Sequence, residues 1–427
     1  MSTAFGHTAR HKFWDFDSQN TPLNHGSFGS TPVEVQEKRF ELIKEIEKNS
    51  DKFMRVDLYK MEEETRDLVS KWINSEKLNT VFVPNASVGF NTVIRSLPLK
   101  EGDVIVHCST MYGACDKTLQ FMENRYGVKS AKVDITYPED SDEDIVEKFR
   151  KVIKENPATK MVIFDTVSSM PGCLLPFNQL TQLCKDLDVL SFIDGAHGIG
   201  LVELNLKENE PDFFVSNLHK WGYVPRGAAV LVVAKKHHNK IHTLPVSHTY
   251  LDDGFEGASE LDKSRRLVDR FTFVGTTDFS THLSTPAAVK FRESLGGEEV
   301  IRKYCFDLAR KAGAYAADFF HTEVLENAAG TLTTAMVNVR LPVSEKWLKN
   351  STAEEKEELL KVLNNYPMEN FDTFVPPIFH NGKLYIRLSC QVYNELSDYK
   401  VGVQAVKEAL KQVPGVLDEQ ALENLTI

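Results

Sequence analysis

Short apolar runs alternate with helix-like stretches between residues 80 and 235, and this alternation constrains the fold more than any other feature of the sequence. The clearest run, residues 161–164, is continuously apolar, as expected of a strand buried on both faces of a parallel sheet. Strands that alternate with helices are typical of a doubly wound sheet with helices on both sides. The sequence therefore predicts an α/β fold with a mostly parallel sheet.

The expected elements follow from apolar periodicity and from helix and turn signals. Strands are expected at 80–84, 104–106, 161–164, 189–193, 213–215 and 228–233, and helices at 32–50, 61–73, 90–97, 142–155 and 177–187. The first 30 residues are expected to form an irregular arm that ends in a tight loop or plain turn at 23–29.

A different pattern begins at Pro286, where a long helical region runs to about Phe320. Strands are expected at 336–341 and 383–389, with a charged helix at 353–364. This order predicts a smaller α+β unit. We therefore expect an N-terminal arm and helix at 1–50, a large domain at 51–285 and a small C-terminal domain at 286–427.

Composition narrows the class of protein. The 427 residues carry a net charge of −11, which argues against nucleic acid as the main partner. No apolar run approaches the ~18 residues of a membrane helix, and the first 17 residues lack the apolar region of a signal peptide. The six cysteines form no CxxC pair, so neither a zinc ribbon nor a secreted disulfide framework is expected. A cytoplasmic protein is the expectation.

Two charged residues stand near the ends of consecutive apolar runs, Asp194 after 189–193 and Lys220 beyond 213–215. Taken singly, the aspartate could be a helix N-cap and the lysine a solvated surface residue. Together, at the ligand-facing edge of a parallel sheet, they suit pyridoxal phosphate. This cofactor needs a lysine amine for a Schiff base and a carboxylate against its pyridine nitrogen.

Other candidates lie at comparable positions. Asn85, Ala86 and Ser87 separate a strand from a helix, so they could present backbone N–H groups to a phosphate or form an ordinary helix cap. Tyr112 follows the strand at 104–106 and could stack on a planar cofactor or pack in the core. Cys115 could lie near the same site, although a buried inert thiol is the alternative.

An arginine and a histidine cluster complete the candidates. Arg387 lies within the strand at 383–389, where its guanidinium could bind a substrate carboxylate or form an internal salt bridge. His237, His238, His242 and His248 lie among lysines without acidic ligands, so a solvated basic surface is expected rather than a metal site.

Five segments give the sequence a recognisable signature: 23–29, 194–197, 217–221, 225–227 and 387–389, the last followed by Tyr393-Asn394. With them the chain resembles, over nearly its whole length, the class V aminotransferase family of fold-type I pyridoxal-phosphate enzymes. Within that family it is most similar to the branch of isopenicillin N epimerase, which includes the fungal-type carbon–sulfur lyases of ergothioneine biosynthesis.

The resemblance implies a role for each matching residue. Lys220 would form the Schiff base and shuttle the α-proton of the substrate, while Asp194, supported by His197, would pair with the pyridine nitrogen. The phosphate would be held by Ala86, Ser87 and Asn217, the phenolic oxygen would lie near Ser168, the ring would lie against Tyr112, and His219 would also contact the cofactor. Thr276 would reach the phosphate of a neighbouring subunit, which implies a homodimer. The substrate would be bound by Asn24, His25 and Arg387.

The resemblance also implies a reaction. We expect β-elimination at a C–S bond of a cysteine conjugate such as hercynylcysteine sulfoxide, giving pyruvate, ammonia and a sulfur product. Epimerisation at the α-carbon, cysteine desulfhydration and transamination are the alternatives. Desulfurases of the family carry a nucleophilic cysteine on a mobile loop before the C-terminal arginine region, whereas Cys390 here follows Arg387 on the expected strand, which argues against a persulfide-forming desulfurase. A binding protein without turnover is a further alternative, but the presence of both Lys220 and Asp194 argues against it.

Overall fold

The computed structural model describes residues 5–250 and 260–417. Within these residues the larger sheet has seven strands in the order β1-β7-β6-β5-β4-β2-β3. Its strands are β1 (Thr80–Val83), β2 (Val104–Cys108), β3 (Lys129–Val133), β4 (Thr159–Asp165), β5 (Leu190–Asp194), β6 (Phe213–Asn217) and β7 (Ala229–Val233). Only β7 runs antiparallel to its neighbours, so the predicted mostly parallel sheet is confirmed.

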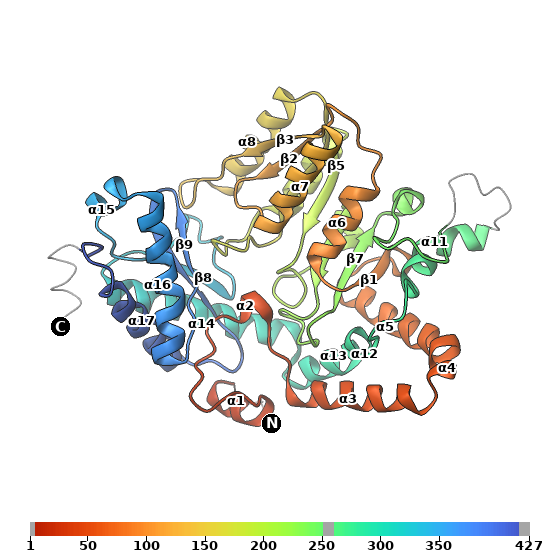
Figure 1. Ribbon diagram of the computed structural model, residues 1–427, viewed down its shortest axis with the longest axis horizontal. Coiled ribbons are helices and arrows are strands. Elements are labelled where there is room, and N and C mark those ends of the chain that lie inside the picture. Colours follow the sequence, from red (N-terminus) through yellow and green to blue (C-terminus); the bar gives the residue numbers. More distant parts are fainter. Residues whose placement is uncertain (1–4, 251–259, 418–427) are drawn as a thin grey trace.

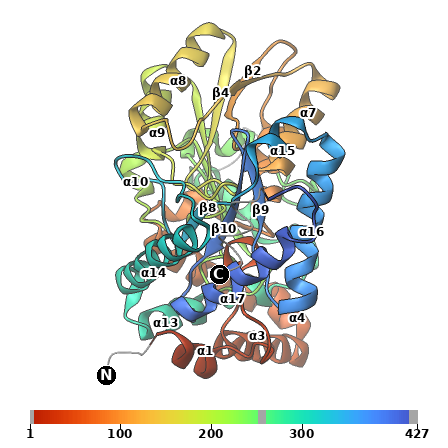
Figure 2. The ribbon, with the colours of Figure 1, turned by 90° about the vertical axis from the view of Figure 1, so that its left-hand side faces the viewer.

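Helices cover both faces of this sheet, as predicted for a doubly wound fold. Figure 2 shows α7 (Gly113–Tyr126) on one side of the strands and α8 (Asp142–Glu155) and α9 (Phe177–Asp186) on the other. Alternate residues of β4 explain this arrangement. Met161 and Ile163 belong to the core cluster that includes α7, whereas Val162 and Phe164 belong to the cluster that includes α8 and α9.

A second, antiparallel sheet forms the smaller unit at the left of Figure 1. It contains β8 (Met336–Arg340), β9 (Pro377–His380) and β10 (Lys383–Ser389) in the order β8-β10-β9. It packs with α14 (Gly297–Phe320), α16 (Ala353–Phe371) and α17 (Leu396–Leu410) in a separate apolar cluster. The predicted α+β character of this region is confirmed, while the exact domain boundaries remain a prediction.

The N-terminal region differs from the irregular arm expected from sequence. It forms α1 (His7–Phe13) and the single turn α2 (His25–Phe28) before α3 (Val33–Lys48). The backbone N–H of Gly6 donates to the Val392 carbonyl at 2.8 Å, and that of His7 donates to the Glu395 carboxylate at 2.8 Å. Because these partners lie more than 380 positions away in the sequence, no local sequence pattern predicts α1.

Several boundaries also differ from the expectations. Helix α6 (Ala86–Ser96) begins four residues before Phe90, because the Asn85 side chain accepts a hydrogen bond from the Val88 N–H at 2.9 Å and caps it. The region expected to be one helix to Phe320 is two, α13 (Thr285–Ser294) and α14. The remaining helices are α4 (Ser50–Lys52), a π-helical turn (Phe53–Asp57), α5 (Leu58–Trp72), α10 (Leu206–Asn209), α11 (Glu260–Thr272), α12 (Ser280–Leu283), α15 (Glu345–Asn350) and two 3₁₀ turns (Lys77–Asn79 and Lys235–Lys240).

The expected solvated histidine surface is wrong for His237 and His238, which are both buried. The Nε2 atom of His237 lies 2.7 Å from the Asp212 carboxylate, an acidic partner 25 positions away. That of His238 lies 3.1 Å from the Asn79 side-chain oxygen. The histidines are thus tied into the fold, and the described residues contain no group of three or more His, Cys, Asp or Glu suited to a metal ion.

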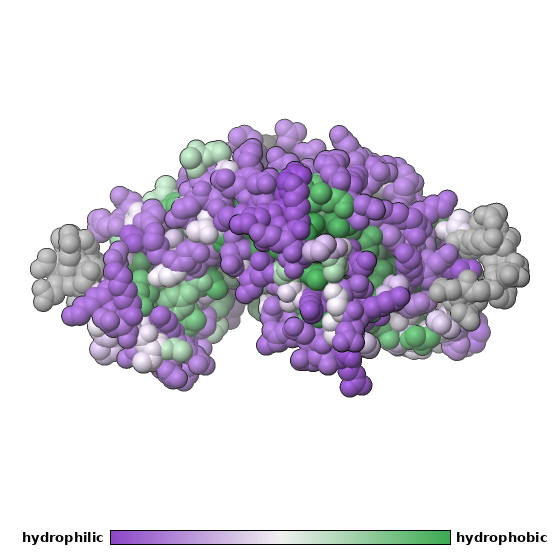
Figure 3. All heavy atoms as spheres, turned by 90° about the horizontal axis from the view of Figure 1, so that it is seen from above, coloured by the Kyte–Doolittle hydropathy of each residue, from purple (hydrophilic) through white to green (hydrophobic). Residues whose placement is uncertain are grey.

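The outer surface is mostly polar. Figure 3 shows hydrophilic side chains over most of the face seen from above, with hydrophobic residues confined to smaller patches. Among the described residues, no helix combines the length and apolar character needed to cross a membrane.

Gly29 caps α2 and is expected to be sensitive to substitution. Its φ is +64°, and an added Cβ would clash with the carbonyl oxygen of His219. Gly29→Ala should therefore lower the free energy of unfolding by more than about 3 kcal/mol, measured by urea denaturation. Gly330→Ala is the matched control, because Gly330 has a similar φ of +72° with open space around it, and it should cost only about 1 kcal/mol. Equal losses in the two variants would contradict the role of the close approach.

Candidate active site

Polar side chains from three neighbouring parallel strands meet at one edge of the large sheet. Asp165 ends β4, Asp194 ends β5 and Asn217 ends β6, and the two aspartates face each other in register. They line a cavity of about 280 Å³ that also includes the start of α6 and Lys220. Strand ends of a parallel sheet collect ligand-binding groups in this way.

The amine of Lys220 faces this cavity and lies 3.1 Å from His197 Nε2. Loss of solvent and the nearby Arg387 lower the pKa of Lys220 to about 8. On its other side, His197 Nδ1 accepts a hydrogen bond from Trp221 Nε1 at 3.1 Å. Burial holds the pKa of His197 well below its usual value, so the ring is neutral.

This arrangement determines where the proton of His197 resides. Trp221 can only donate, so Nδ1 of the neutral ring carries no hydrogen and Nε2 must carry it. The Nε2–H group therefore points at the Lys220 nitrogen, where only an unprotonated amine can accept it. His197 thus favours the neutral, nucleophilic form of Lys220.

Asp194 is fixed at the opposite wall. One of its oxygens accepts a hydrogen bond from the Ala196 N–H at 2.9 Å, and the other accepts one from the Cys115 thiol at 3.6 Å. Burial raises the pKa of Cys115, so this thiol is a neutral donor rather than a nucleophile. Both possibilities given for Cys115 hold: the thiol is buried and inert, and it also lines the site.

Asp165 is a site residue that the sequence reasoning missed. It accepts a hydrogen bond from the Cys108 thiol at 3.4 Å and lines the cavity beside Asp194. Burial, followed by repulsion from Asp194, raises its pKa well above the usual value. The available signal was its position directly after the apolar run 161–164, equivalent to that of Asp194 one strand later.

The start of α6 lies beside these acids. Asn217 accepts a hydrogen bond from the Ala86 N–H at 2.9 Å, which ties the end of β6 to the start of α6. Ala86 and Ser87 both line the cavity. Tyr112 lies on its rim and is half exposed, so it is not a core tyrosine.

Arg387 lies beside the cavity on β10 and is buried. Its guanidinium donates to the Ser169 carbonyl at 2.6 Å, to Asn24 Oδ1 at 2.8 Å and to Ser27 Oγ at 2.9 Å. Its Nε has no partner, and no carboxylate of the described residues pairs with the guanidinium. The internal salt bridge considered from sequence is therefore not formed in this part of the chain. Ser27 and Ser169 are further site residues that the sequence reasoning missed.

Two predicted residues, His25 and His219, make hydrogen-bond contacts within the protein. His25 Nδ1 lies 2.9 Å from the Tyr393 hydroxyl, and its Nε2 lies 2.8 Å from the Lys220 carbonyl. Both ring nitrogens are thus engaged, and His25 positions the backbone of Lys220. His219 lines the cavity while its Nδ1 lies 2.9 Å from the Ala228 carbonyl.

Ser168 and Thr276 are not brought into this cavity. The Ser168 hydroxyl donates to the Pro171 carbonyl at 2.6 Å, and its neighbour Ser169 lines the cavity instead. Thr276 is exposed and lines a separate cavity of about 590 Å³. Their roles toward the cofactor remain predictions.

Comparison with known proteins assigns the family. Residues 37–340 match the model of the aminotransferase class V family. The chain belongs to this family. It is 30% identical to the hercynylcysteine sulfoxide lyase of Schizosaccharomyces pombe, over 95% of this chain and 98% of that protein. It is also 30% identical to an L-cysteine desulfhydrase-like protein of Epichloe uncinata, over 93% of this chain and 94% of that protein.

Solved structures confirm the fold. The cystine C–S lyase C-DES, in complex with its reaction product cysteine persulfide, superposes with a TM-score of 0.72 at 15% identity. The match covers 91% of this chain and 97% of that structure. The predicted fold-type I architecture is thus confirmed. As a class V aminotransferase the protein is an enzyme that uses pyridoxal 5′-phosphate, and the amine, carboxyl groups and helix start in one cavity fit that group.

Burial of His25 predicts a pH-dependent stability. Burial lowers the pKa of His25 to about 3 in the folded protein, whereas an unfolded histidine binds a proton below its ordinary value of about 6.5. The unfolded state therefore binds more protons between pH 6.5 and 3, and the free energy of unfolding should fall as the pH falls through this window.

This dependence can be measured by urea denaturation between pH 7 and 4. The variant His25→Gln should show a shallower decline, because one buried neutral histidine is gone, while its stability at pH 7 also drops. His11→Gln, at an exposed position of α1, should keep the wild-type decline. An unchanged slope in His25→Gln would exclude His25 as a contributor.

Proposed function

We propose that this enzyme is a carbon–sulfur lyase that cleaves an S-substituted cysteine, such as hercynylcysteine sulfoxide, by β-elimination. One observation carries the amino-acid part of the proposal: Arg387 is buried beside Lys220 without a carboxylate partner among the described residues. An α-carboxylate would supply the charged partner that the buried Nε of Arg387 lacks. The names of the two relatives support sulfur chemistry.

In this proposal the residues of the cavity hold the cofactor at three points. Lys220 would hold it covalently through its amine, Asp194 would pair with the pyridine nitrogen, and Ala86, Ser87 and Asn217 would hold the phosphate at the start of α6. Tyr112 would contact the ring. When bound, the ring delocalises the negative charge that develops at the α-carbon of an amino acid.

The remaining steps fall to the protein. Lys220 would take the proton from the α-carbon of the substrate, and its pKa of about 8 leaves a useful fraction of neutral amine near neutral pH. Arg387, positioned by Asn24 and Ser27, holds the substrate carboxylate and fixes the orientation of the bonds around the α-carbon.

Bond changes then balance without an added oxidant or reductant. The α-C–H bond breaks with its proton going to Lys220, and the C–S bond breaks with its electron pair going to sulfur. The three-carbon remainder takes up water and yields pyruvate and ammonia. The sulfur product is a thiol from a thioether and a sulfenate from a sulfoxide.

The proposal extends to assembly and location. We expect the enzyme to be a homodimer, in which Thr276, exposed on one subunit, would reach a cofactor phosphate in the other. We also expect it to be cytoplasmic. Both points are carried by the family resemblance and stay predictions.

Pyruvate release tests the reaction. Wild-type enzyme with an S-substituted cysteine should release pyruvate and ammonia in equal amounts, followed by coupled lactate dehydrogenase and by ammonia assay. Lys220→Ala should lower kcat by at least about 10³-fold, because both the covalent anchor and the base are lost. Loss of optical rotation without pyruvate would favour the epimerase alternative, and a keto acid without ammonia would favour transamination.

Arg387→Gln tests the carboxylate site. Removing the charge should raise KM at least about 30-fold, since a buried charge-assisted pair is lost. Arg387→Lys should recover only part of the loss, because a lysine cannot make two parallel hydrogen bonds. An Arg340→Gln control, at the half-exposed end of β8 where Arg340 pairs with Glu323, should leave KM unchanged. A KM unaffected by Arg387→Gln would rule out this role.

A further inference from the structure

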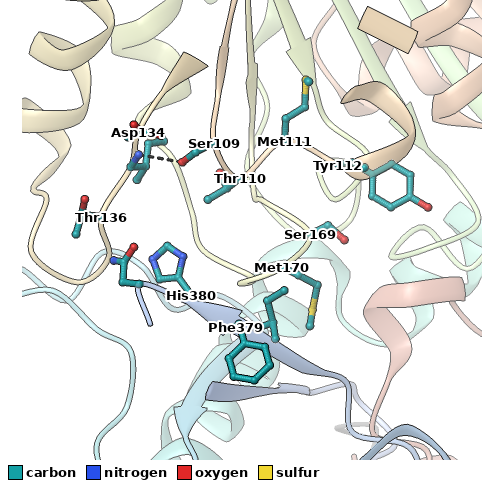
Figure 4. A pocket seen from close by; sticks show the side chains of 14 residues that line it. Ser109, Thr110, Met111, Tyr112, Asp134, Thr136, Ser169, Met170, Phe379 and His380 are labelled. Carbon is teal, nitrogen blue, oxygen red and sulfur yellow. Dashed lines mark hydrogen bonds between the residues drawn. The ribbon is translucent and has the colours of Figure 1, made fainter. Parts of the chain in front are cut away.

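A second cavity of about 620 Å³ adjoins the active-site cavity, and Tyr112 and Ser169 line both (Figure 4). Its walls come from both sheets. The large domain supplies residues 109–113 after β2 and 134–136 after β3, and the small domain supplies residues 378–381 at the end of β9. A substituent on a substrate held between Lys220 and Arg387 would therefore extend past Tyr112 toward this space.

Hydrogen bonds between the two domains fix the walls of this second cavity. The Tyr137 N–H donates to His380 Nε2 at 3.1 Å, and the Asn381 side chain donates to the Tyr137 carbonyl at 3.0 Å. The Ser109 hydroxyl accepts from the Ile135 N–H at 3.0 Å, the dashed line in Figure 4. The space is thus part of the folded framework.

Its lining mixes apolar and uncharged polar groups. Met111, Met170 and Phe379 are among its apolar lining residues, and Figure 4 shows Phe379 and Met170 on the side of the small domain. His380 accepts a hydrogen bond at Nε2, and burial lowers its pKa, so it faces the cavity as a neutral ring. Such a surface suits a flat or methylated polar group.

Charge at the cavity is negative. Asp134 is the single formally charged residue among those that line it, and neither lysine nor arginine does so. Two cations among the described residues lie close to the lining. Lys148 donates to the Asp134 carbonyl at 3.0 Å and pairs with Asp140 at 2.5 Å, so its charge is already matched. Arg387 donates to the Ser169 carbonyl at 2.6 Å, and in the proposed function its charge is matched by the substrate α-carboxylate. An added anion would meet Asp134 without a compensating cation.

We propose that this second cavity binds the sulfur substituent of the substrate and selects bulky substituents that are neutral or cationic over anionic ones. The inference rests on the proposed function and refines it. Free cysteine would leave the cavity unfilled, so the preferred substrates carry a group of several heavy atoms on sulfur. An anionic conjugate of the same size is rejected by the field of Asp134.

Three cysteine conjugates of similar size test the charge selection: S-(2-aminoethyl)-, S-(2-hydroxyethyl)- and S-carboxymethyl-L-cysteine. Wild-type enzyme should show kcat/KM values at least about tenfold higher for the first two than for the third. Asp134→Lys should lower the cationic-to-anionic ratio by about tenfold or more. Asp186→Lys makes the same charge change at the end of α9, at the opposite edge of the sheet, and should keep the wild-type ratio.

Size selection is tested by filling the cavity. Thr136→Trp should lower kcat/KM for the hydroxyethyl conjugate by at least about tenfold and leave S-methyl-L-cysteine within twofold, with Tm and the visible cofactor spectrum showing that the variant folds. Equal losses on both substrates, or an unchanged charge ratio in Asp134→Lys, would overturn the proposal.

A binding measurement separates this inference from the proposed reaction. Rapid mixing of each conjugate with wild-type holoenzyme, with the visible absorbance read before pyruvate forms, gives its affinity separately from turnover. If no conjugate releases pyruvate, the lyase assignment fails, but affinities ordered as cationic and neutral above anionic would still support the cavity. If pyruvate forms but the affinities of the conjugates do not depend on the charge or size of the sulfur substituent, the lyase assignment stands and the cavity inference is wrong.

Discussion

The active site depends on the protonation state of the Lys220 amine, which is buried. The groups around it determine that state. Two buried carboxyl groups, Asp165 and Asp194, favour the charged amine, while desolvation and Arg387 oppose it. The result is a pKa of about 8, below the ordinary value of 10.5 for a lysine in water. His197 orients the Lys220 amine. Because Nδ1 of His197 accepts from Trp221, Nε2 carries the proton and points it at the lysine nitrogen.

This balance requires contacts between parts of the chain that are far apart in sequence. The single turn α2 occupies the space between the two sheets in Figure 1. From there His25 reaches the carbonyl of Lys220, and Asn24 accepts from Arg387 on the small domain. The N-terminal segment therefore connects the amine of the large domain with the guanidinium of the small one. A site that binds both the amine and the carboxylate of one amino acid needs these two groups at a fixed separation.

In our proposal the two cavities bind different parts of the substrate: the first binds the amino-acid part and the second binds the sulfur substituent. Around Lys220 the walls are built from charged and hydrogen-bonding groups that suit the common part of any amino acid. Beyond Tyr112 the walls come from loops after β2 and β3 and from the end of β9, segments that contribute little to the sheet core. Substrate choice can therefore change in these loops while the strand ends that carry the chemistry stay intact.

The sequence by itself determined the parallel sheet, the α+β unit and the pairing of Asp194 with Lys220, because apolar runs and the polar residues that end them are local signals. It also indicated Arg387, since an arginine inside a strand needs a partner. Only the tertiary structure decided that Asp165 joins Asp194, that Ser169 rather than Ser168 lines the site, and that α1 forms. Those outcomes depend on strand register, side-chain direction and partners hundreds of residues away, and a one-dimensional pattern carries none of them.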